Sequence, residues 1–275
     1  VRMTPVQRLK NIIGGSAGNF VEWFDWFAYA SFALYFSRAF FPDGNQTSQL
    51  LSAAIVFGGG FIARPIGALL LGTYADKAGR RAALTLSVAM MCAGSLLIAV
   101  TPTGFGFLSP ALLVAARLLQ GLSVGGEYGA SATYVSEMAG ETRRGFWSGF
   151  LYVTLIGGQL AAMLLQVLLQ NVLSEAQLFD WGWRIPFVVG AALAVVVFWI
   201  RRGIHETRSF TEAPEPLHER GKAMLLFLKY PKETAIVVAL TAGGGLGFYT
   251  YTTYMQKLLV NTAGFAKPVA AQIMT

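Results

Sequence analysis

Five charged side chains lie inside segments of the sequence that are otherwise apolar. They are Arg64, Arg117, Glu22, Asp25 and Glu127. A charge at the centre of a bilayer costs roughly 2.5–3.5 kcal/mol on insertion scales, so such residues are kept where they pair, face water or have a function. Guanidinium groups form paired hydrogen bonds with carboxylates, and buried acids can take up and release protons. These residue types predict a site that binds an organic acid and handles protons.

The two arginines and the three acids have separate expected roles. Arg64 and Arg117 are the bases within the first six apolar segments, and we expect them to bind substrate carboxylates. Alternatively, each could neutralise an acid of its own helical bundle. Glu22 and Asp25 are three residues apart and share one face of a helix, and Glu127 is the third candidate for proton coupling. Each acid could instead bond a neighbouring arginine or the backbone.

The segments that hold these residues predict an all-α membrane protein. The chain has 275 residues, of which 55% are hydrophobic and 13% are charged. Apolar stretches long enough to cross a hydrocarbon core of about 30 Å recur along the whole length. We expect seven spans and the start of an eighth near residue 268. The seven are 18–36, 50–74, 82–101, 110–136, 146–169, 187–200 and 235–254.

The basic residues predict the orientation. Most of the 21 Lys and Arg residues fall in the loops of one side, with Arg201 and Arg202 among them at the start of a polar stretch. Basic loops resist translocation, so we expect a cytoplasmic N-terminus. The positive charge then faces anionic lipid headgroups and implies no nucleic-acid partner. The opposite side holds Arg38, Arg184, Lys257 and Lys267.

Three parts follow from this pattern. Residues 1–200 are expected to form a six-helix transmembrane bundle, and 201–233 a cytoplasmic linker that contains Pro214 and Pro216. Residues 234–275 are expected to start a second bundle. The seventh span adds Tyr249, Tyr251 and Lys257 as candidate binding residues, although an interfacial aromatic belt would also explain tyrosines near a span end.

The loop between the second and third spans has a regular arrangement of glycine, acidic and basic residues. They are Gly72, Asp76, Lys77, Gly79, Arg80 and Arg81. Gly72 would let two helices approach closely, and Asp76 would cap the next helix or pair with a base. Gly79 permits a left-handed turn. An ordinary cytoplasmic loop would explain the bases but not this spacing.

This loop resembles the G-x-x-x-D-[RK]-x-G-R-[RK] motif of the major facilitator superfamily. Segments 18–25, 64–67, 117–129 and 181–187 are similar to its metabolite:proton symporter family. Segments 152–160 and 248–264 are most similar to the members that carry α-ketoglutarate. The resemblance implies the major facilitator fold, with twelve spans in two six-helix halves. This chain is then expected to be a fragment with a complete N-terminal bundle and the start of the C-terminal one.

The resemblance implies a secondary active transporter and not an enzyme. A dicarboxylate, α-ketoglutarate, would enter with a proton by alternating access, and the 72–81 loop would latch the cytoplasmic face. The resemblance adds Gln159 to the candidate substrate-binding residues. The proton gradient would supply the energy, without a cofactor or metal, in a protein of the bacterial inner membrane that is monomeric at full length.

Two kinds of alternative stay open at the level of sequence. Within the same family, the solute could be citrate, shikimate, proline or betaine. From another class, the bundle could belong to a membrane sensor or assembly partner that transports nothing. The sequence has no phosphate-binding G-x-x-x-x-G-K-[ST] loop, so ATP hydrolysis by this chain is not expected.

Overall fold

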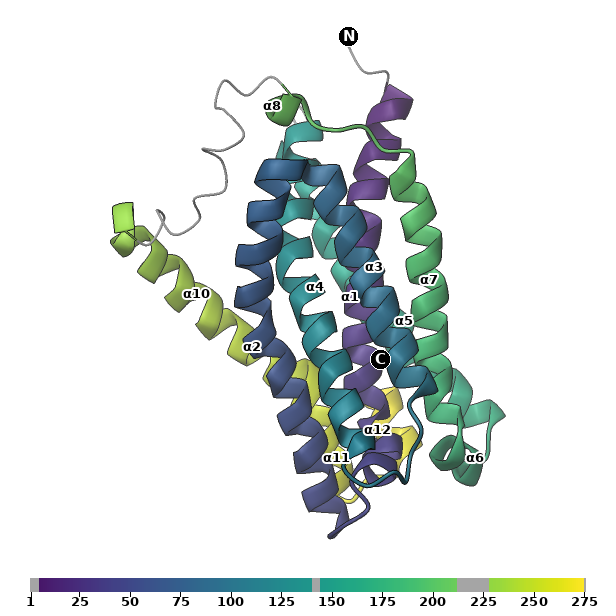
Figure 1. The fold of residues 1–275 in the computed structure, drawn as a ribbon. Helices are drawn as coiled ribbons and strands as arrows, with labels where there is room; N and C mark the ends of the chain where they lie inside the picture. Colours follow the sequence, from purple (N-terminus) through teal and green to yellow (C-terminus); the bar gives the residue numbers. More distant parts are fainter. Residues whose placement is uncertain (1–4, 140–143, 212–227, 275) are drawn as a thin grey trace.

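The computed structural model describes residues 5–139, 144–211 and 228–274, and these ranges are helical without a strand (Figure 1). The long helices are α1 (Pro5–Phe40), α2 (Gln46–Ala78), α3 (Arg80–Val100), α4 (Leu108–Met138), α5 (Arg144–Val172), α7 (Ile185–Arg202) and α10 (Pro231–Tyr249). The short elements are α6 (Glu175–Asp180), η1 (Gly182–Arg184), α8 (Arg208–Thr211), η3 (Thr250–Tyr254), α11 (Met255–Asn261) and α12 (Lys267–Met274). Residues 212–227 of the expected linker lie outside the described ranges.

Six helical segments are long and apolar enough to cross a membrane. They are Gln46–Ala78, Arg80–Val100, Leu108–Met138, Arg144–Val172, Gly182–Arg202 and Pro231–Asn261. These segments contain six of the seven expected spans, so the prediction of an all-α membrane protein is confirmed. In Figure 1, α1 to α5 and α7 run side by side as one bundle.

The remaining expected span, 18–36, lies in α1, which is not one of the six apolar segments. Its middle holds Asn19, Glu22 and Asp25, and these polar residues lower its mean hydropathy. The helix packs against α4, α5 and α7, and every residue from 21 to 37 is buried. The neighbouring helices therefore surround the polar residues of α1.

Helices α2 and α4 pack with their backbones in contact. A side chain at Gly121 would overlap the carbonyl of Gly60, and one at Gly125 would overlap the backbone of Arg64. Small residues at such positions let helices approach more closely than other side chains allow. This contact fixes the position of Arg64 on α2 relative to α4.

The end of α10 meets the bundle at an aromatic cluster formed by Trp23, Trp26, Phe57, Phe61 and Tyr249. Ring centroids are 4.9 Å apart for Trp26 and Phe57, and 4.8 Å apart for Phe61 and Tyr249. These spacings are typical of favourable aromatic pairs. None of the residues of α10 is buried, and Figure 1 shows the helix starting away from the bundle and slanting toward it.

Candidate functional site

A cleft of about 1170 Å³ lies between α2 and the continuous run of α10, η3 and α11. Most of its lining is apolar, and Phe57, Phe61 and Leu246 are among the apolar residues. Two cations, Arg64 from α2 and Lys257 from α11, line the same cleft. A concave apolar site with a few polar groups is the usual form of a small-molecule site.

Arg64 reaches the cleft beside aromatic rings and a tyrosine hydroxyl. Its Nη1 donates to the Oη of Tyr249 at 3.0 Å. The guanidinium carbon lies 5.1 Å from the Trp26 ring centroid and 5.4 Å from that of Phe61. Such cation–π contacts hold a cation in place without neutralising it. Within the part of the chain that the structure describes, no carboxylate pairs with Arg64.

Lys257 follows an irregular turn of its helix. The segment η3 is π-helical, and the Met255 N–H bonds to the Thr250 carbonyl. Such turns occur often at functional sites. The Nζ of Lys257 lies 6.0 Å from the Phe57 ring centroid. Across residues 5–139, 144–211 and 228–274, it too has no carboxylate partner.

Arg117 lies beneath the aromatic cluster and is not part of the cleft lining. It is 1% exposed, and its guanidinium carbon is 4.3 Å from the Trp26 ring centroid and 4.4 Å from that of Tyr29. Its Nη1 donates to Gln120 Oε1 at 2.7 Å. Its Nε and Nη2 have no hydrogen-bond partner among the described residues. The Trp26 ring therefore contacts both predicted arginines, one on the cleft and one buried.

Hydrogen bonds connect Arg117 to Asp25. Gln120 Nε2 donates to Ser95 Oγ at 3.1 Å, and Ser95 donates to Asp25 Oδ2. Asp25 is 0% exposed, and its Oδ1 lacks a hydrogen-bond partner in the described residues. A side chain at Gly190 of α7 would overlap this carboxylate, so glycine leaves the space that Asp25 needs.

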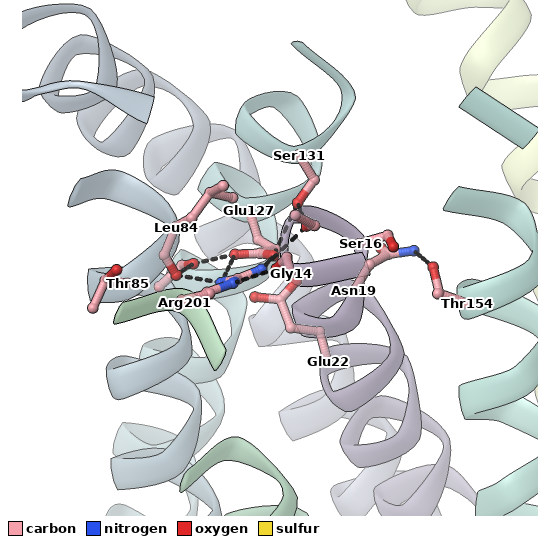
Figure 2. A network of polar contacts seen from close by, with 12 residues as sticks. Gly14, Ser16, Asn19, Glu22, Leu84, Thr85, Glu127, Ser131, Thr154 and Arg201 are labelled. Carbon is pink, nitrogen blue, oxygen red and sulfur yellow. Dashed lines mark hydrogen bonds and ion pairs between the residues drawn. The ribbon is translucent and has the colours of Figure 1, made fainter. Parts of the chain in front are cut away.

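Glu127 is held by a buried ion pair with Arg201 (Figure 2). Arg201 Nη1 donates to Glu127 Oε2 at 2.9 Å, and Nη2 bonds the other carboxylate oxygen. Ser131 donates to Glu127 at 2.9 Å, and Ser87 donates to it as well. Both carboxylate oxygens of Glu127 therefore accept hydrogen bonds, two from a guanidinium and two from hydroxyls.

Arg201 corrects one expectation from the sequence. It was counted among the cytoplasmic bases at the start of the linker, but α7 continues to Arg202 and Arg201 is 0% exposed. Its guanidinium also donates to the carbonyls of Gly14, Gly15 and Leu84. A residue at the end of a span can face inward or outward, and hydropathy does not distinguish the two. The only signal was the buried Glu127, which required a partner.

The small residue Gly18 makes room for this ion pair. A side chain at Gly18 would overlap both the Arg201 guanidinium and the Glu127 carboxylate. Glu22, one turn further along α1, is 1% exposed and accepts from Ser123 Oγ at 2.7 Å. Its Oε2 has no hydrogen-bond partner in the described ranges. The three predicted acids therefore have three different environments.

Two more predicted binding residues, like Arg117, do not line the cleft. Gln159 lies on α5 and is 8% exposed, and its Oε1 has no hydrogen-bond partner in the described part of the chain. Its neighbour Gly158 contacts the backbone of α1 at Phe20. Tyr251 is 69% exposed, and Tyr249 and Tyr254 are the tyrosines that line the cleft. The structure thus brings Arg64, Tyr249 and Lys257 together there.

The 72–81 loop contains an ion pair between Asp76 and Arg80. Gly79 has φ of 103°, the left-handed region that its sequence position predicted. Among the described residues, no atom beyond the adjacent residues and the backbone of its own helix lies within 4 Å of where a side chain of Gly72 would begin, so close helix packing does not require glycine there. Lys77 is exposed.

The start of α3 is capped by a residue from beyond α7. The backbone N–H groups of Arg80 and Arg81 donate to the two carboxylate oxygens of Glu206, each at 3.1 Å. Arg81 Nη2 also donates to the Arg202 carbonyl at 2.6 Å. Asp76 was expected to cap this helix or pair with a base, and it does the second. Glu206 was missed because the sequence does not show which residue folds back onto a helix start.

Sequence comparison gives one family match over most of the chain. The family described as sugar (and other) transporter matches residues 11–233. An alpha-ketoglutarate permease of Escherichia coli strain K12 is 54% identical over 98% of this chain and 62% of its own length. A citrate-proton symporter of Klebsiella pneumoniae is 35% identical over 90% of this chain and 56% of its own length. The chain thus spans less than two thirds of the length of either relative.

Structure comparison gives the same fold. The partially occluded inward open xylose transporter XylE of E. coli matches with a TM-score of 0.73 at 15% identity, covering 98% of this chain and 67% of that one. A crystal structure of the D-xylose-proton symporter matches with a TM-score of 0.73 at 16% identity, covering 97% and 64%. Both similarities concern the fold alone.

Proposed function

Because the chain belongs to the sugar (and other) transporter family of the major facilitator superfamily, we propose that the protein carries a dicarboxylate, α-ketoglutarate, across the membrane together with a proton. The relatives are transporters and not enzymes, and the chain is a multi-pass protein of a bacterial inner membrane. The 54% identity to an alpha-ketoglutarate permease supports the substrate, and the citrate-proton symporter supports proton coupling.

The observation that carries the proposal is the pair of unneutralised cations in one apolar cleft. Arg64 and Lys257 both line it, and neither has a carboxylate partner among the described residues. A dicarboxylate has two anionic ends, so one end can accept paired hydrogen bonds from Arg64 and the other can meet Lys257. Tyr249 already touches the Arg64 guanidinium and lies where it can contact the first carboxylate.

The buried charges support the coupled part of the proposal. Arg117 adds a third cation directly beneath the aromatic cluster. Glu22, Asp25 and Glu127 are 1%, 0% and 0% exposed, so a change in the protonation of any of them changes the field that an anionic substrate meets. The proton gradient would supply the energy through this link, without a cofactor.

The cycle that we propose is alternating access, in which two helical bundles rock about a central site. The N-terminus would face the cytoplasm, since the basic loops lie on its side. The 72–81 loop would latch that face, and the lipid headgroups would meet its exposed bases. The full-length protein would work as a monomer.

Uptake by proteoliposomes that hold the full-length protein tests the proposal. With the outside made acidic, labelled α-ketoglutarate should accumulate above its outside concentration, and a protonophore should abolish the accumulation. Unlabelled α-ketoglutarate should compete better than citrate, shikimate or proline. Stronger competition by another of these solutes would reassign the substrate. Absence of accumulation of all four would contradict transport and favour a sensor or assembly role.

A further inference from the structure

We propose that Ser95 and Gln120 are positioning residues that couple the protonation of Asp25 to the guanidinium of Arg117. The inference rests on the proposed function, because it identifies the acid through which a proton would be linked to the substrate. It concerns side chains on three helices, α1, α3 and α4, that the sequence alone does not connect.

The four side chains form one continuous run of hydrogen bonds. Arg117 donates to Gln120 at 2.7 Å, Gln120 donates to Ser95 at 3.1 Å, and Ser95 donates to Asp25. Arg117 is 1% exposed and the other three are 0% exposed. Buried groups joined in a chain of hydrogen bonds polarise one another, so a change at one end of such a run affects the other.

The direction of the bonds matches an ionised Asp25. An amide oxygen only accepts and an amide nitrogen only donates, so one orientation of the Gln120 side-chain amide satisfies both of its neighbours. Every donor along it points away from Arg117 and toward the carboxylate. The run therefore connects a cation and an anion that do not touch.

Ser95 can respond to a proton on Asp25. Its single hydroxyl hydrogen has two acceptors within reach, the Asp25 carboxylate and the Met91 carbonyl at 3.0 Å. When Asp25 gains a proton, its new O–H can donate to Ser95 Oγ, and the Ser95 hydrogen can turn to Met91. No other bond has to form or break. Ser95 stays fully bonded in both states, so the exchange has a small cost.

The exchange changes the charge near the cleft. A protonated Asp25 no longer offsets Arg117, so the net charge of this region rises by one. Because Nε and Nη2 of Arg117 have no hydrogen-bond partner among the described residues, the added positive potential favours an anionic substrate. Proton binding at Asp25 and substrate binding then support each other.

The other groups around Asp25 do not offer an equivalent path. Cys92 on α3 and Arg117 on α4 are the titratable groups that interact with it, α7 presents Gly190, and Glu22 lies one turn away on α1. None of the described neighbours is a base in direct contact with Asp25.

The two remaining acids are less suited to this role. Glu127 already forms a buried ion pair with Arg201. Glu22 accepts from Ser123, whose other contact is the Ser87 carbonyl, so its hydrogen bonds lead to the backbone and not to a cation. Asp25 is the acid whose hydrogen bonds reach an arginine without an ion pair.

Ser95→Ala and Gln120→Met test the inference, with Ser87→Ala as the matched control. Ser87 also lies on α3 and also donates to a buried carboxylate, that of Glu127. Both test variants should move the pH dependence of α-ketoglutarate uptake and affinity toward higher pH, because each removes hydrogen bonds that support the ionised form of Asp25. Ser87→Ala should keep the wild-type pH profile. An unchanged profile in Ser95→Ala, or the same change in Ser87→Ala, would overturn the inference.

The double variant adds a second criterion. Ser95→Ala with Gln120→Met should change the profile no more than either single variant, because both interrupt one run. Ser95→Ala with Ser87→Ala should have the same pH profile as Ser95→Ala alone. Independent additive effects of Ser95 and Gln120 would contradict a shared path.

An infrared titration separates this inference from the proposed function. The carbonyl band of protonated Asp25 can be measured without substrate, and it is identified by its loss in Asp25→Asn. Ser95→Ala removes a donor to the ionised form, so the band should appear at higher pH than in the wild type, and Ser87→Ala should not move it. If the protein does not carry α-ketoglutarate but shows this shift, the proposed substrate is wrong and the hydrogen-bonded link between Asp25 and Arg117 is supported. If the protein carries α-ketoglutarate but shows no shift, the proposed substrate is supported and the link through Ser95 is wrong.

Discussion

At the scale of single residues, the charged side chains inside this bundle fall into two groups, one paired with an opposite charge and one not. Arg201 and Glu127 neutralise each other, with every carboxylate oxygen bonded. Arg64, Arg117 and Lys257 gather around the aromatic cluster instead and have no ion-pair partner in the described ranges. A cation without a partner is costly inside a membrane, so its retention points to a ligand.

Arg64→Ala should raise the KM for α-ketoglutarate roughly 10- to 100-fold, since a hydrogen bond to a charged group contributes about 1.5–3 kcal/mol. The measurement is initial uptake rate against substrate concentration, with protein amount checked by immunoblot. Arg202→Ala is the control, because Arg202 is exposed and its guanidinium contacts the Trp199 ring instead of the cleft. A normal KM in Arg64→Ala would remove this residue from the site.

Asp25→Asn should abolish the response of uptake to an imposed pH gradient while exchange of α-ketoglutarate across the membrane persists. An amide has the shape of the protonated acid but cannot release a proton. Glu22→Gln and Glu127→Gln, measured in parallel, should keep the gradient response. If all three amides keep it, none of these acids carries the coupled proton.

Arg201→Gln should destabilise the bundle by about 3–5 kcal/mol, the usual cost of leaving one partner of a buried ion pair alone. Thermal unfolding of the detergent-solubilised protein measures this loss as a lower midpoint. Arg202→Gln changes the neighbouring arginine, which is exposed, and should leave the midpoint near that of the wild type. Equal midpoints for the two variants would mean that the Glu127 contact contributes no stability.

At the scale of helices, hydropathy predicted nearly all the spans. It did not predict whether residues at the ends of the spans face the bundle or the solvent. The ranges 50–74 and 110–136 both fall within observed helices, because a long apolar run has few other ways to satisfy its backbone in lipid. The expected span ended at residue 200, whereas α7 continues to Arg202, so Arg201 lies in the bundle and not in the loop. The capping of α3 by Glu206 and the contact between Ser95 and Asp25 depend on tertiary packing, which no local pattern encodes.

Glu206→Ala should loosen the first turn of α3. Loss of a helix cap costs about 0.5–2 kcal/mol, and here the backbone N–H groups of Arg80 and Arg81 would lose their acceptor. Hydrogen–deuterium exchange of peptides covering residues 79–85 should become faster. Glu233→Ala, in the first turn of α10, is the control and should leave these peptides unchanged. Unaltered exchange in Glu206→Ala would show that the cap is dispensable.

At the scale of the whole molecule, the fold and the family were predicted from a few motifs, whereas the cleft was not. The loop motif and the buried charges pointed to the right superfamily. The packing of α2 against α10, η3 and α11 decides which candidate binding residues share a site. Tyr249 and Lys257 line the cleft, whereas Tyr251 is exposed. That choice depends on the rotation of one helix, which side-chain spacing predicts poorly once the helix is irregular.

Asp76→Asn should shift the balance between the two access states, because it removes the ion pair with Arg80. The assay is labelling of Leu246→Cys in the cleft by an impermeant maleimide from the cytoplasmic side, after the single native cysteine, Cys92, is replaced by serine. Labelling should become faster. Asp43→Asn, in an exposed loop outside this motif, should not alter the rate. Equal rates for all three proteins would argue against a latch.

The π-helical turn η3 sets the angular phase of everything that follows it. Such a turn contains one residue more than an α-helical turn, and each residue of an α-helix advances the side chains by about 100°. Regular α-helical winding through 250–254, with every residue retained, would rotate α11 by about that amount and turn Lys257 out of the cleft. Deleting one residue from 250–254 would remove the extra residue and return Lys257 to the same face, so the irregular turn and the length of the segment together decide whether Arg64 and Lys257 line one cleft.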